Sequence, residues 1–554
     1  IRAMPEKIPP PRNEGEFDYA NWLRQKGITC RIMAGSDDWQ LQYINKGNSF
    51  KAAALRLRHW FSGALARSGL KGDQLSVAQA LLLGNDDQID PGLLRAYSAS
   101  GTLHVLSVSG MHVALLFAAL SVLLAPLLRL RGGAFWLAGV LLCALWGYAM
   151  LTGASPSVLR AVTMLSFVVA GKPFRKNGHI LNMLAAAAIV LLAADPQLLT
   201  DIGFQLSFLA VGGIVVLQPV FQQQWQPASR VMRWIWSLVS VTLVAQLVTF
   251  PLGLYYFGQF PVYFLLSNLI VIPISTLVMY GGIVLLIVSP FQQISEWVAL
   301  PLSWMLDVLN GAVRYTEFLP GAVLQTSRWT LPQLSLLYLF IATTLGWLLM
   351  RRPRLVIWSG AVCTLLLITV AADDAAQSNK HELVFASLPG ATAIEIVHGN
   401  THLLLSDSAL LRSPGLTDFH LQPGWRQKGL APVQPVILND TLQFRNPLAA
   451  VSGNWISAAG KIIYRVQRKC NWRKINIHCD ILLLTQNSTV KLDSIIARTK
   501  PELVIADGSN SDKKIAKWKA ICEKQNIRFY DVKNEKALVI KAEKQSEKQS
   551  ESER

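Results

Sequence analysis

The sequence predicts a mainly α polytopic membrane protein of about ten transmembrane helices, followed by a C-terminal α/β domain. Apolar residues make up 52% of the 554 residues and charged residues only 16%, which is less charge than a soluble protein of this size carries. Apolar segments follow one another from residue 111 to residue 372. After Asp373 the pattern changes to short β-branched runs that alternate with stretches of helical spacing.

Charge and motifs narrow the class of protein. The net charge of +18 suits contact with anionic lipid or nucleic acid and says little about the fold. None of the six cysteines forms a C-x-x-C pair, and neither a G-x-x-x-x-G-K-[ST] nor an H-E-x-x-H motif occurs. The sequence therefore predicts no cofactor and encodes no P-loop motor. Because the chain begins at Ile1, we interpret its start as that of a fragment.

The N-terminal part has two sections. Residues 1–48 are soluble in character, Pro-rich at first and then polar and aromatic. Residues 49–110 form an amphipathic, re-entrant approach to the apolar half. Within them, Leu55, Leu57 and Trp60 alternate with basic side chains, which is typical of a helix on a membrane surface. A solvated helix that packs on its own domain remains open.

Residues 111–372 contain the predicted spans, centred near 120, 143, 163, 187, 210, 245, 275, 306, 341 and 363. A span needs about 20 apolar residues, so the segments 156–171 and 180–194 are short. The basic loops alternate with loops that hold few cations, which places the basic loops in the cytoplasm. With an even number of spans, both soluble ends then lie outside.

Polar side chains are concentrated where the apolar half begins, in 103-LHVLSVSGMHVALL-116. His104, Ser107, Ser109 and His112, with Gly110, admit a catalytic, a metal-binding or a passage-lining interpretation. A metal site lacks a third ligand, and V-S-G-M-H is not the G-x-S-x-G motif of a nucleophilic serine. We therefore favour a polar passage or a structural hydrogen-bonding role.

Further polar or helix-breaking residues recur in the apolar half. Burying such polar groups in lipid costs several kcal/mol each, so they usually face a bundle interior or a water-filled cavity. Asp307 and Arg314 lie on one helical face, which predicts a salt bridge to a neighbouring helix. The spread of these residues over most spans favours a hydrated interior. The predicted lining residues are Ser155, Arg160, Asn182, Gln205, Ser207, Gln246, Pro251 and Asn268.

The C-terminal part comprises an α/β domain at residues 377–541 and a charged, low-complexity tail at residues 542–554, which we expect to be disordered. The stretch 464-YRVQRKCNWRK-474 combines cations, which contact phosphates, with aromatic rings, which stack on unpaired bases. A solvated basic strand pair is the alternative. The predicted DNA-binding residues are Arg465, Arg468, Lys469, Trp472, Arg473 and Lys474.

Four ordered segments resemble the ComEC-type DNA-internalisation channel of bacterial competence. They are 103-LHVLSVSGMHVALL-116, 152-TGASPSVLRA-161, 195-DPQLLTDIGFQLSFLAV-211 and 245-AQLVTFPLGLYYFGQFPVYFLLSNLIVIP-273. Residues 10–28 look like the end of the family's oligonucleotide-binding domain, which would leave a short N-terminal β remnant. The resemblance implies an inner-membrane channel that carries single-stranded DNA into the cytoplasm. It also implies a periplasmic DNA receptor and a cytoplasmic helicase or single-strand-binding protein as partners, and leaves a homo-oligomer open.

The C-terminal domain resembles the family's metallo-β-lactamase-like module, with its metal motif altered. Gln486 and Asn487 stand near the positions of two family histidines, and amides are poor zinc ligands beside imidazole. His398 and His402 are four apart, without a matching carboxylate. We therefore expect a metal-free, non-hydrolytic domain and no enzyme activity. The rival hypotheses are a metal-dependent nuclease acting on the non-transported strand and a small-molecule or lipid transporter.

Overall fold

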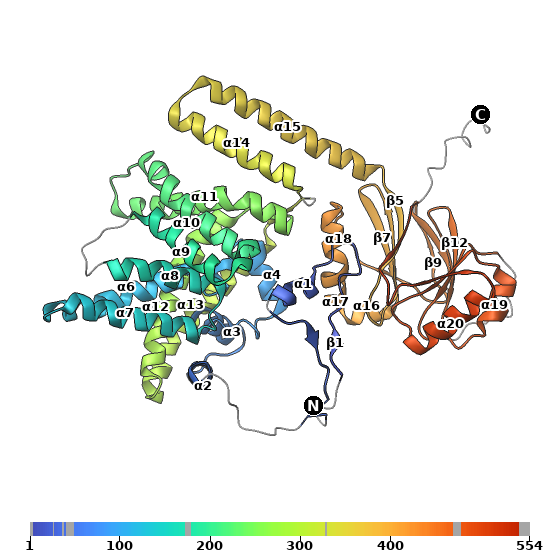
Figure 1. Cartoon of the computed structure of the whole chain (residues 1–554), viewed down its shortest axis with the longest axis horizontal. Helices are drawn as coiled ribbons and strands as arrows, with labels where there is room; N and C mark the ends of the chain where they lie inside the picture. Colours follow the sequence, from blue (N-terminus) through green and yellow to red (C-terminus); the bar gives the residue numbers. More distant parts are fainter. Residues whose placement is uncertain are drawn as a thin grey trace. The chain divides into compact units, whose positions relative to one another are not determined.

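The computed structural model describes residues 4–25, 27–35, 38–39, 49–171, 179–326, 329–468 and 478–541. The chain divides into two compact units. The first, residues 41–324, is the helical unit. The second joins residues 1–40 to residues 325–554 and contains the C-terminal strands (Figure 1). The tail at residues 542–554 lies outside the described residues.

The helical unit consists almost entirely of helices. Its elements in chain order are α2 (Ser49–Arg67), α3 (Gly72–Leu83), α4 (Pro91–Ala99), α5 (Leu103–Leu106), α6 (Gly110–Leu123), η1 (Ala125–Arg129), α7 (Gly133–Leu151), α8 (Pro156–Gly171), α9 (Ile180–Ala194), η3 (Pro196–Thr200), α10 (Ile202–Gln223), α11 (Arg230–Phe257), β3 (Gln259–Pro261), α12 (Phe264–Val288), α13 (Gln292–Phe318) and β4 (Val323–Gln325).

Each of the ten predicted span centres falls within a helix, from α6 to α15 (Pro353–Ser378), but only some of these helices have the dimensions of a span. In the part of the chain that the structure describes, six helices are long and apolar enough to cross a membrane: α7, α10, α11, α12, α14 (Leu331–Met350) and α15. The apolar helices α6, α8 and α9 have 14, 16 and 15 residues. At about 1.5 Å per residue they are shorter than a bilayer core. The structure therefore supports a membrane protein without confirming ten spans.

The core of the helical unit forms around α3, a helix buried on most sides. Val77 and Leu81 of α3 pack with Val278 of α12 and Leu306 of α13, and all four side chains are fully buried. By contrast, the predicted amphipathic stretch lies in α2, where Leu55 is among several exposed apolar side chains. This exposure is compatible with the predicted membrane-surface role, which stays a prediction.

The second unit contains the strands. Its elements are β1 (Glu6–Lys7), α1 (Tyr19–Gln25), β2 (Cys30–Arg31), α14, α15, β5 (His381–Phe385), β6 (Ala393–His398), β7 (Thr401–Ser406), α16 (Ser408–Arg412), α17 (Pro414–Leu416), η4 (Thr417–Leu421), α18 (Gln422–Gln427), β8 (Val436–Ile437), β9 (Gln443–Arg445), β10 (Ala449–Ser452), β11 (Trp455–Ala458), β12 (Lys461–Val466), β13 (Ile481–Leu484), α19 (Leu492–Thr499), β14 (Leu503–Ala506), α20 (Asp512–Lys524), β15 (Arg528–Asp531) and β16 (Leu538–Lys541).

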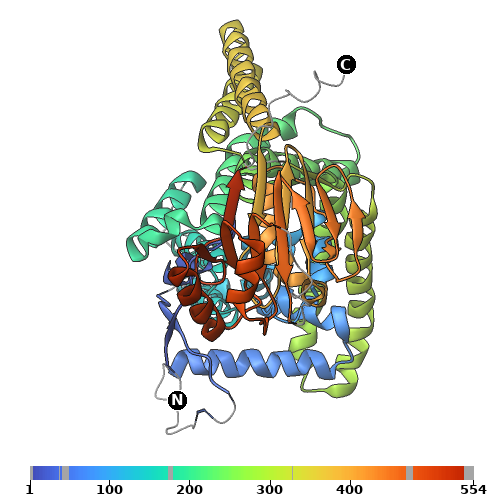
Figure 2. The same ribbon diagram turned by 90° about the vertical axis from the view of Figure 1, so that its right-hand side faces the viewer.

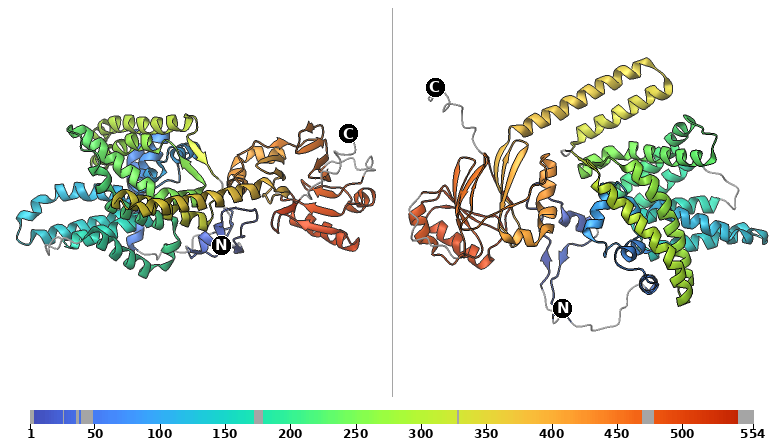
Figure 3. Two further views of the ribbon diagram at one scale, coloured as in Figure 1. Left: turned by 90° about the horizontal axis from the view of Figure 1, so that it is seen from above. Right: turned by 180° about the vertical axis from the view of Figure 1, so that it is seen from behind.

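These strands form two facing sheets, as Figures 2 and 3 show. One has the order β16-β5-β6-β7-β8 and the other β15-β14-β13-β12-β11-β10-β9, with β12 to β15 parallel. Ile394 and Leu405 of the first sheet share a buried core with Ile481 and Ile505 of the second. The outer faces are covered by α16 to α18 and by α19 and α20. The C-terminal domain is thus a four-layer α/β sandwich, as the alternating sequence pattern predicts.

The N-terminal segment belongs to this second unit. Its short ribbon pairs Lys7 of β1 with Cys30 of β2. Residues 12–16 then lie along the sandwich: the Asn13 side chain donates to the Ser387 carbonyl at 2.9 Å and accepts from the Ser387 N–H at 2.8 Å. Ala537 N donates to the Arg12 carbonyl at 2.8 Å. Residues far apart in the sequence are therefore held together by one backbone–backbone hydrogen bond and by two that the Asn13 side chain forms with backbone groups.

Candidate functional site

In the helical unit, three helices begin close together. The Ser157 hydroxyl at the start of α8 donates to the carbonyl of Val108, just before α6, at 2.7 Å. A side chain built at Gly110 would lie 3.5 Å from the Ala161 methyl group, so these two helices pack tightly. Further along α8, the Arg160 guanidinium lies 3.8 Å from Asp201, the N-cap of α10. Because helix N-termini carry partial positive charge, their convergence creates a region that attracts anions.

Arg160 is the central charge of this region, which we call the helix-start cluster (Ser109, His112, Ser157, Arg160 and Asp201). The arginine is 3% exposed, and its Nε and Nη1 atoms have no hydrogen-bond partner among the described residues. Gly203 packs against Arg160: a Cβ atom built at Gly203 would lie 3.8 Å from both terminal nitrogens of the guanidinium. A buried donor without a partner costs about 1–3 kcal/mol, and more when it is charged. An acceptor such as a phosphate oxygen or water would satisfy these donors.

His112 is the second buried polar group of the cluster. Its Nδ1 accepts the Ser109 backbone N–H at 3.0 Å and lies 3.1 Å from the Ser109 hydroxyl, which completes a capping box at the start of α6. This hydrogen bond assigns the ring proton to Nε2 in the neutral imidazole. The Nε2 atom is buried and has no hydrogen-bond partner in the described part of the chain. His112 therefore combines a structural role with a donor left over for a ligand.

The other members of the predicted polar stretch are less buried than His112. His104 on α5 and Ser107 after it are exposed, while Ser109 and Gly110 are half-buried. The four side chains therefore occupy different environments, and the structure gives hydrogen-bond evidence of a pair for Ser109 and His112 alone.

The remaining predicted lining residues are dispersed. Gln205 of α10 accepts from the Tyr256 hydroxyl and donates to the Leu199 carbonyl, both at 2.9 Å. The other predicted lining residues lie in different surroundings: Ser155 lies beside Ser157, Asn182 is exposed on α9, Ser207 and Gln246 are half-buried, Pro251 is buried within α11, and Asn268 is buried on α12. The Oδ1 atom of Asn268 has no hydrogen-bond partner among the described residues.

The predicted helix-to-helix contact of Asp307 and Arg314 is confirmed, and both residues of α13 reach α3. Arg314 pairs with Asp73 at 2.6 Å, and Asp307 accepts from the Gln74 side chain at 2.8 Å. This pair of contacts fixes α13 on the buried helix and has no role in the helix-start cluster.

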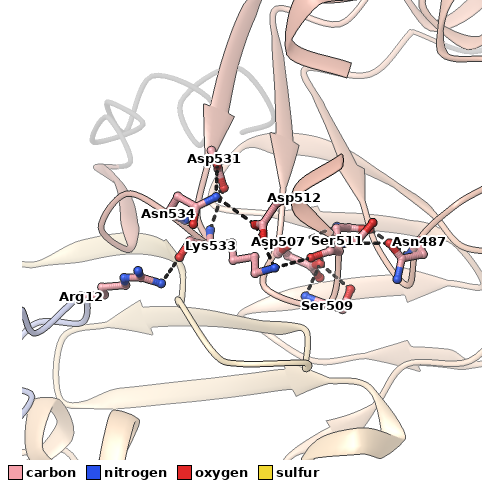
Figure 4. Close-up of polar contacts among 10 residues, drawn as sticks. Arg12, Asn487, Asp507, Ser509, Ser511, Asp512, Asp531, Lys533 and Asn534 are labelled. Atoms are coloured by element: carbon pink, nitrogen blue, oxygen red, sulfur yellow. Dashed lines mark hydrogen bonds and ion pairs between the residues drawn. The ribbon is translucent and has the colours of Figure 1, made fainter. Parts of the chain in front are cut away.

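In the C-terminal domain, loops after parallel strands meet at one edge (Figure 4). Gln486 N donates to the Ser509 hydroxyl at 2.6 Å, and Asn487 N donates to the Asn510 side chain at 2.9 Å. The Asn487 side chain in turn accepts from Ser511 N at 2.8 Å. Gln486 and Asn487, which the resemblance placed near two family histidines, thus connect these loops to one another. Among the described residues, no group of three His, Cys, Asp or Glu side chains could hold a metal ion.

Asp507 lies beneath these loops and links the two sheets. Its Oδ2 contacts the Thr392 hydroxyl, and its Oδ1 accepts from Ser509 N at 3.0 Å and from the Asn510 amide at 2.9 Å. Burial raises the pKa of Asp507 from 3.8 to about 7, against the lowering effect of these hydrogen bonds. The sequence analysis missed this residue, because nothing in 503-LVIAD-507 shows that the carboxylate turns inward.

The two histidines that could have supported a metal site have other partners. His402 Nδ1 lies 2.8 Å from Glu395 Oε1, and its Nε2 lies 2.7 Å from the Ala431 carbonyl. The His398 ring packs on His381, with centroids 4.0 Å apart. Each of the two thus lies within the five-stranded sheet rather than in the loops of Figure 4.

The predicted DNA-binding patch is described only in part. Lys469, Trp472, Arg473 and Lys474 lie outside the described residues. Arg465 is 1% exposed, donates to the Leu438 carbonyl at 3.2 Å and to Asn454 at 3.3 Å, and lies 3.9 Å from Asp440. This arginine is therefore a buried part of the sandwich and not a surface contact, because β12 turns it inward. Arg468 stays a prediction.

Comparison with known proteins identifies the family. A profile described as "Competence protein" matches residues 81–352, and one described as "ComEC C-terminal domain" matches residues 383–542. ComE operon protein 3 of Bacillus subtilis (strain 168) is 30% identical over 365 residues, which cover 64% of this chain and 44% of that protein. Competence protein ComA of Neisseria gonorrhoeae is 29% identical over 308 residues, which cover 52% of this chain and 42% of that protein.

Recombination protein 2 of Haemophilus influenzae is 26% identical over 274 residues, which cover 47% of this chain and 33% of that protein. The matched region thus spans less than half the length of each of these relatives. No solved structure matches the chain. The two profiles follow one another along most of the sequence, and the first contains all four motif segments. The chain belongs to the ComEC-type competence protein family.

Proposed function

We propose that the chain is part of an inner-membrane channel that takes up single-stranded transforming DNA during natural competence. The observation that carries this proposal is the helix-start cluster, where Arg160 and His112 hold buried donors for which the described residues provide no acceptor. DNA brings one phosphate per nucleotide, and a conduit must bind that charge weakly enough to release it. A single arginine, with its charge partly offset by Asp201 at 3.8 Å and with hydroxyls and an imidazole as neighbours, meets both requirements.

The family motifs support this location. Three of the four motif segments, 103–116, 152–161 and 195–211, supply the starts of α6, α8 and α10. The fourth, 245–273, contacts the third through the hydrogen bond between Tyr256 and Gln205. A periplasmic DNA receptor and a cytoplasmic helicase or single-strand-binding protein are the partners that such a channel requires.

Uptake of labelled DNA tests the proposal. A deletion strain is complemented with the wild-type chain or with His112→Ala, and internalised single strands are measured. We expect the variant to be inserted normally and to take up about ten-fold less DNA, since one buried hydrogen-bonding group contributes about 1–2 kcal/mol. Normal uptake by the deletion strain would refute the function, whereas normal uptake by the variant would remove His112 alone from it.

The C-terminal domain is proposed to act without hydrolysis. The hydrogen bonds of Gln486 and Asn487 to neighbouring loops support this proposal, because both backbone N–H groups and the Asn487 side chain already have partners within the protein. Cleavage of labelled DNA by the purified chain after addition of Mn²⁺ or Zn²⁺ would contradict it.

We further propose that the N-terminal segment and the C-terminal domain lie on the same, periplasmic side of the membrane. The contacts of Arg12 and Asn13 with the sandwich support this, because contacting segments require an even number of crossings between them. Cys30 is exposed, as is Arg412. Two variants are compared: one keeps Cys30 as its single cysteine, and the other carries the Arg412→Cys substitution as its single cysteine. We expect an impermeant maleimide to label both variants from the periplasmic side. Labelling of the two residues from opposite sides would contradict the arrangement.

A further inference from the structure

The turn that joins α10 to α11 encloses a groove of about 550 Å³. Its lining includes Arg233, Gln222, Trp225 and Trp236. The Trp236 indole donates to the Gln222 carbonyl at 3.2 Å and so caps one of the last carbonyls of α10. The rings of Trp225 and Trp236 meet edge to face, with centroids 5.4 Å apart. The groove therefore has walls fixed by hydrogen bonding and ring packing.

The positive charge at this turn has no acidic residue close to it in the sequence. Between Asp201 and Glu296 the sequence contains no acidic residue, and Arg230 and Arg233 are its only charged residues. Both arginines are exposed in the first turn of α11, and neither forms an ion pair in the described parts of the chain. Cations at a helix N-terminus oppose its dipole, so an external anion would stabilise this end of α11.

The position of the turn indicates which kind of anion it would bind. Both α10 and α11 have the length and composition of membrane spans, so the turn between them lies at a membrane–water interface. Trp225 and Trp234 are exposed there, as are the apolar side chains of Val231 and Met232. Tryptophan is enriched at the headgroup level of bilayers, where its ring is apolar and its N–H meets water. A nucleic acid strand would leave the apolar members of this surface without a partner.

We propose that the α10–α11 groove is a binding site for the headgroup of an anionic phospholipid. Arg230 and Arg233 contact the lipid phosphate, Gln222 and its neighbouring glutamines contact the polar headgroup, and the rings of Trp225 and Trp236 lie against the glycerol and the first methylene groups. Basic pockets at the ends of spans bind acidic headgroups through this combination of charge and interfacial aromatic rings. The site anchors one end of the α10–α11 pair independently of any DNA transport.

Native mass spectrometry of the full chain in detergent tests the site with two probes, phosphatidylglycerol and phosphatidylcholine. An arginine near an anionic headgroup contributes about 1 kcal/mol, so the double variant Arg230→Gln/Arg233→Gln is expected to bind phosphatidylglycerol about 25-fold more weakly. Phosphatidylcholine binding should weaken much less, because the choline ammonium of this lipid offsets the charge of the phosphate that the arginines contact. The matched control is Arg412→Gln, which removes an exposed arginine from the other unit and should leave both affinities unchanged.

A second variant keeps the charges and changes the walls. Trp225→Ala should weaken both lipids to a similar extent, because the ring contacts parts that the two lipids share. Retained phosphatidylglycerol affinity in the double arginine variant would overturn the proposal. Displacement of phosphatidylglycerol from the wild-type chain by a single-stranded oligonucleotide, lost in the same variant, would assign the groove to nucleic acid instead.

Discussion

Replacing Arg160 by glutamine is expected to reduce DNA uptake by about 100-fold while membrane insertion stays normal. The guanidinium is the one charge of the helix-start cluster with unused donors, at a site where three helix starts add positive potential. A hydrogen bond from a charged group contributes about 1.5–3 kcal/mol, and the upper end of this range corresponds to a factor of about 100. Internalised labelled DNA, normalised to the amount of inserted protein, measures the effect.

Asp201→Asn separates ligand binding from internal pairing. Asp201 accepts the Phe204 N–H at 2.7 Å as the N-cap of α10, and asparagine caps a helix equally well. The substitution therefore removes only the carboxylate charge that lies 3.8 Å from Arg160. If Arg160 serves a passing phosphate, uptake by this variant should be retained or increased, because the competing anion is gone.

The opposite pattern would contradict the role of Arg160 in transport. A purely structural ion pair would make Arg160→Gln and Asp201→Asn equally harmful, with the loss seen in protein level and protease resistance rather than in uptake. Arg160→Lys adds a third measurement: lysine keeps the charge and loses the planar fork, so intermediate uptake would indicate that the geometry of the donors matters as well as their charge.

The helices of the membrane half could be predicted because apolar composition is a strong local signal. Every predicted centre from 120 to 363 falls within a helix. The number of spans could not be predicted in the same way. Helices α6, α8 and α9 have 14 to 16 residues, and α13 carries Glu296, Asp307, Arg314 and Glu317. Apolar runs reveal a buried helix, but its surroundings decide whether lipid or protein buries it.

The candidate site was predicted in its parts and not in its assembly. The sequence singled out Arg160 and His112 as polar groups in apolar surroundings, whereas Asp201 was noted only as part of the segment 195–211. Their convergence depends on the packing of α6, α8 and α10, which no local pattern encodes. One signal was available: a buried arginine needs a counter-charge, and Asp201 is an N-cap that directly precedes a long apolar helix.

In the C-terminal domain, alternation predicted strands without predicting which face each side chain takes. Arg465 lies in a basic stretch and is buried, because β12 has a neighbour on each side and a covered face on each side. The composition of a strand gives the charge of such a residue but does not give its orientation, because a shift of one position along the strand moves the side chain to the opposite face of the sheet.

Asp507 should make the C-terminal domain less stable as pH rises. Burial raises the pKa of Asp507 from 3.8 to about 7. Between these values the folded chain keeps the proton that the unfolded chain has lost, so the free energy of unfolding falls with increasing pH and becomes level above about pH 7. A shift of about 3 units corresponds to about 4 kcal/mol. Hydrogen–deuterium exchange of β13 and β14 in the full chain, corrected for intrinsic rates, measures the part of this fall between pH 5 and 7, about 3 kcal/mol, and the level region up to pH 8.

Asp507→Asn should remove the dependence by replacing an ionisable group with a neutral one of the same shape. The amide oxygen can still accept from Ser509 N and the Asn510 side chain, and the amide nitrogen can donate to the Thr392 hydroxyl. We therefore expect flat protection from pH 5 to 8, at a level near that of the wild-type chain at pH 5. The control Asp418→Asn changes an exposed carboxylate and should keep the wild-type slope. An unchanged slope in Asp507→Asn would show that another group binds the proton, and the link between the two sheets would then be independent of Asp507 ionisation.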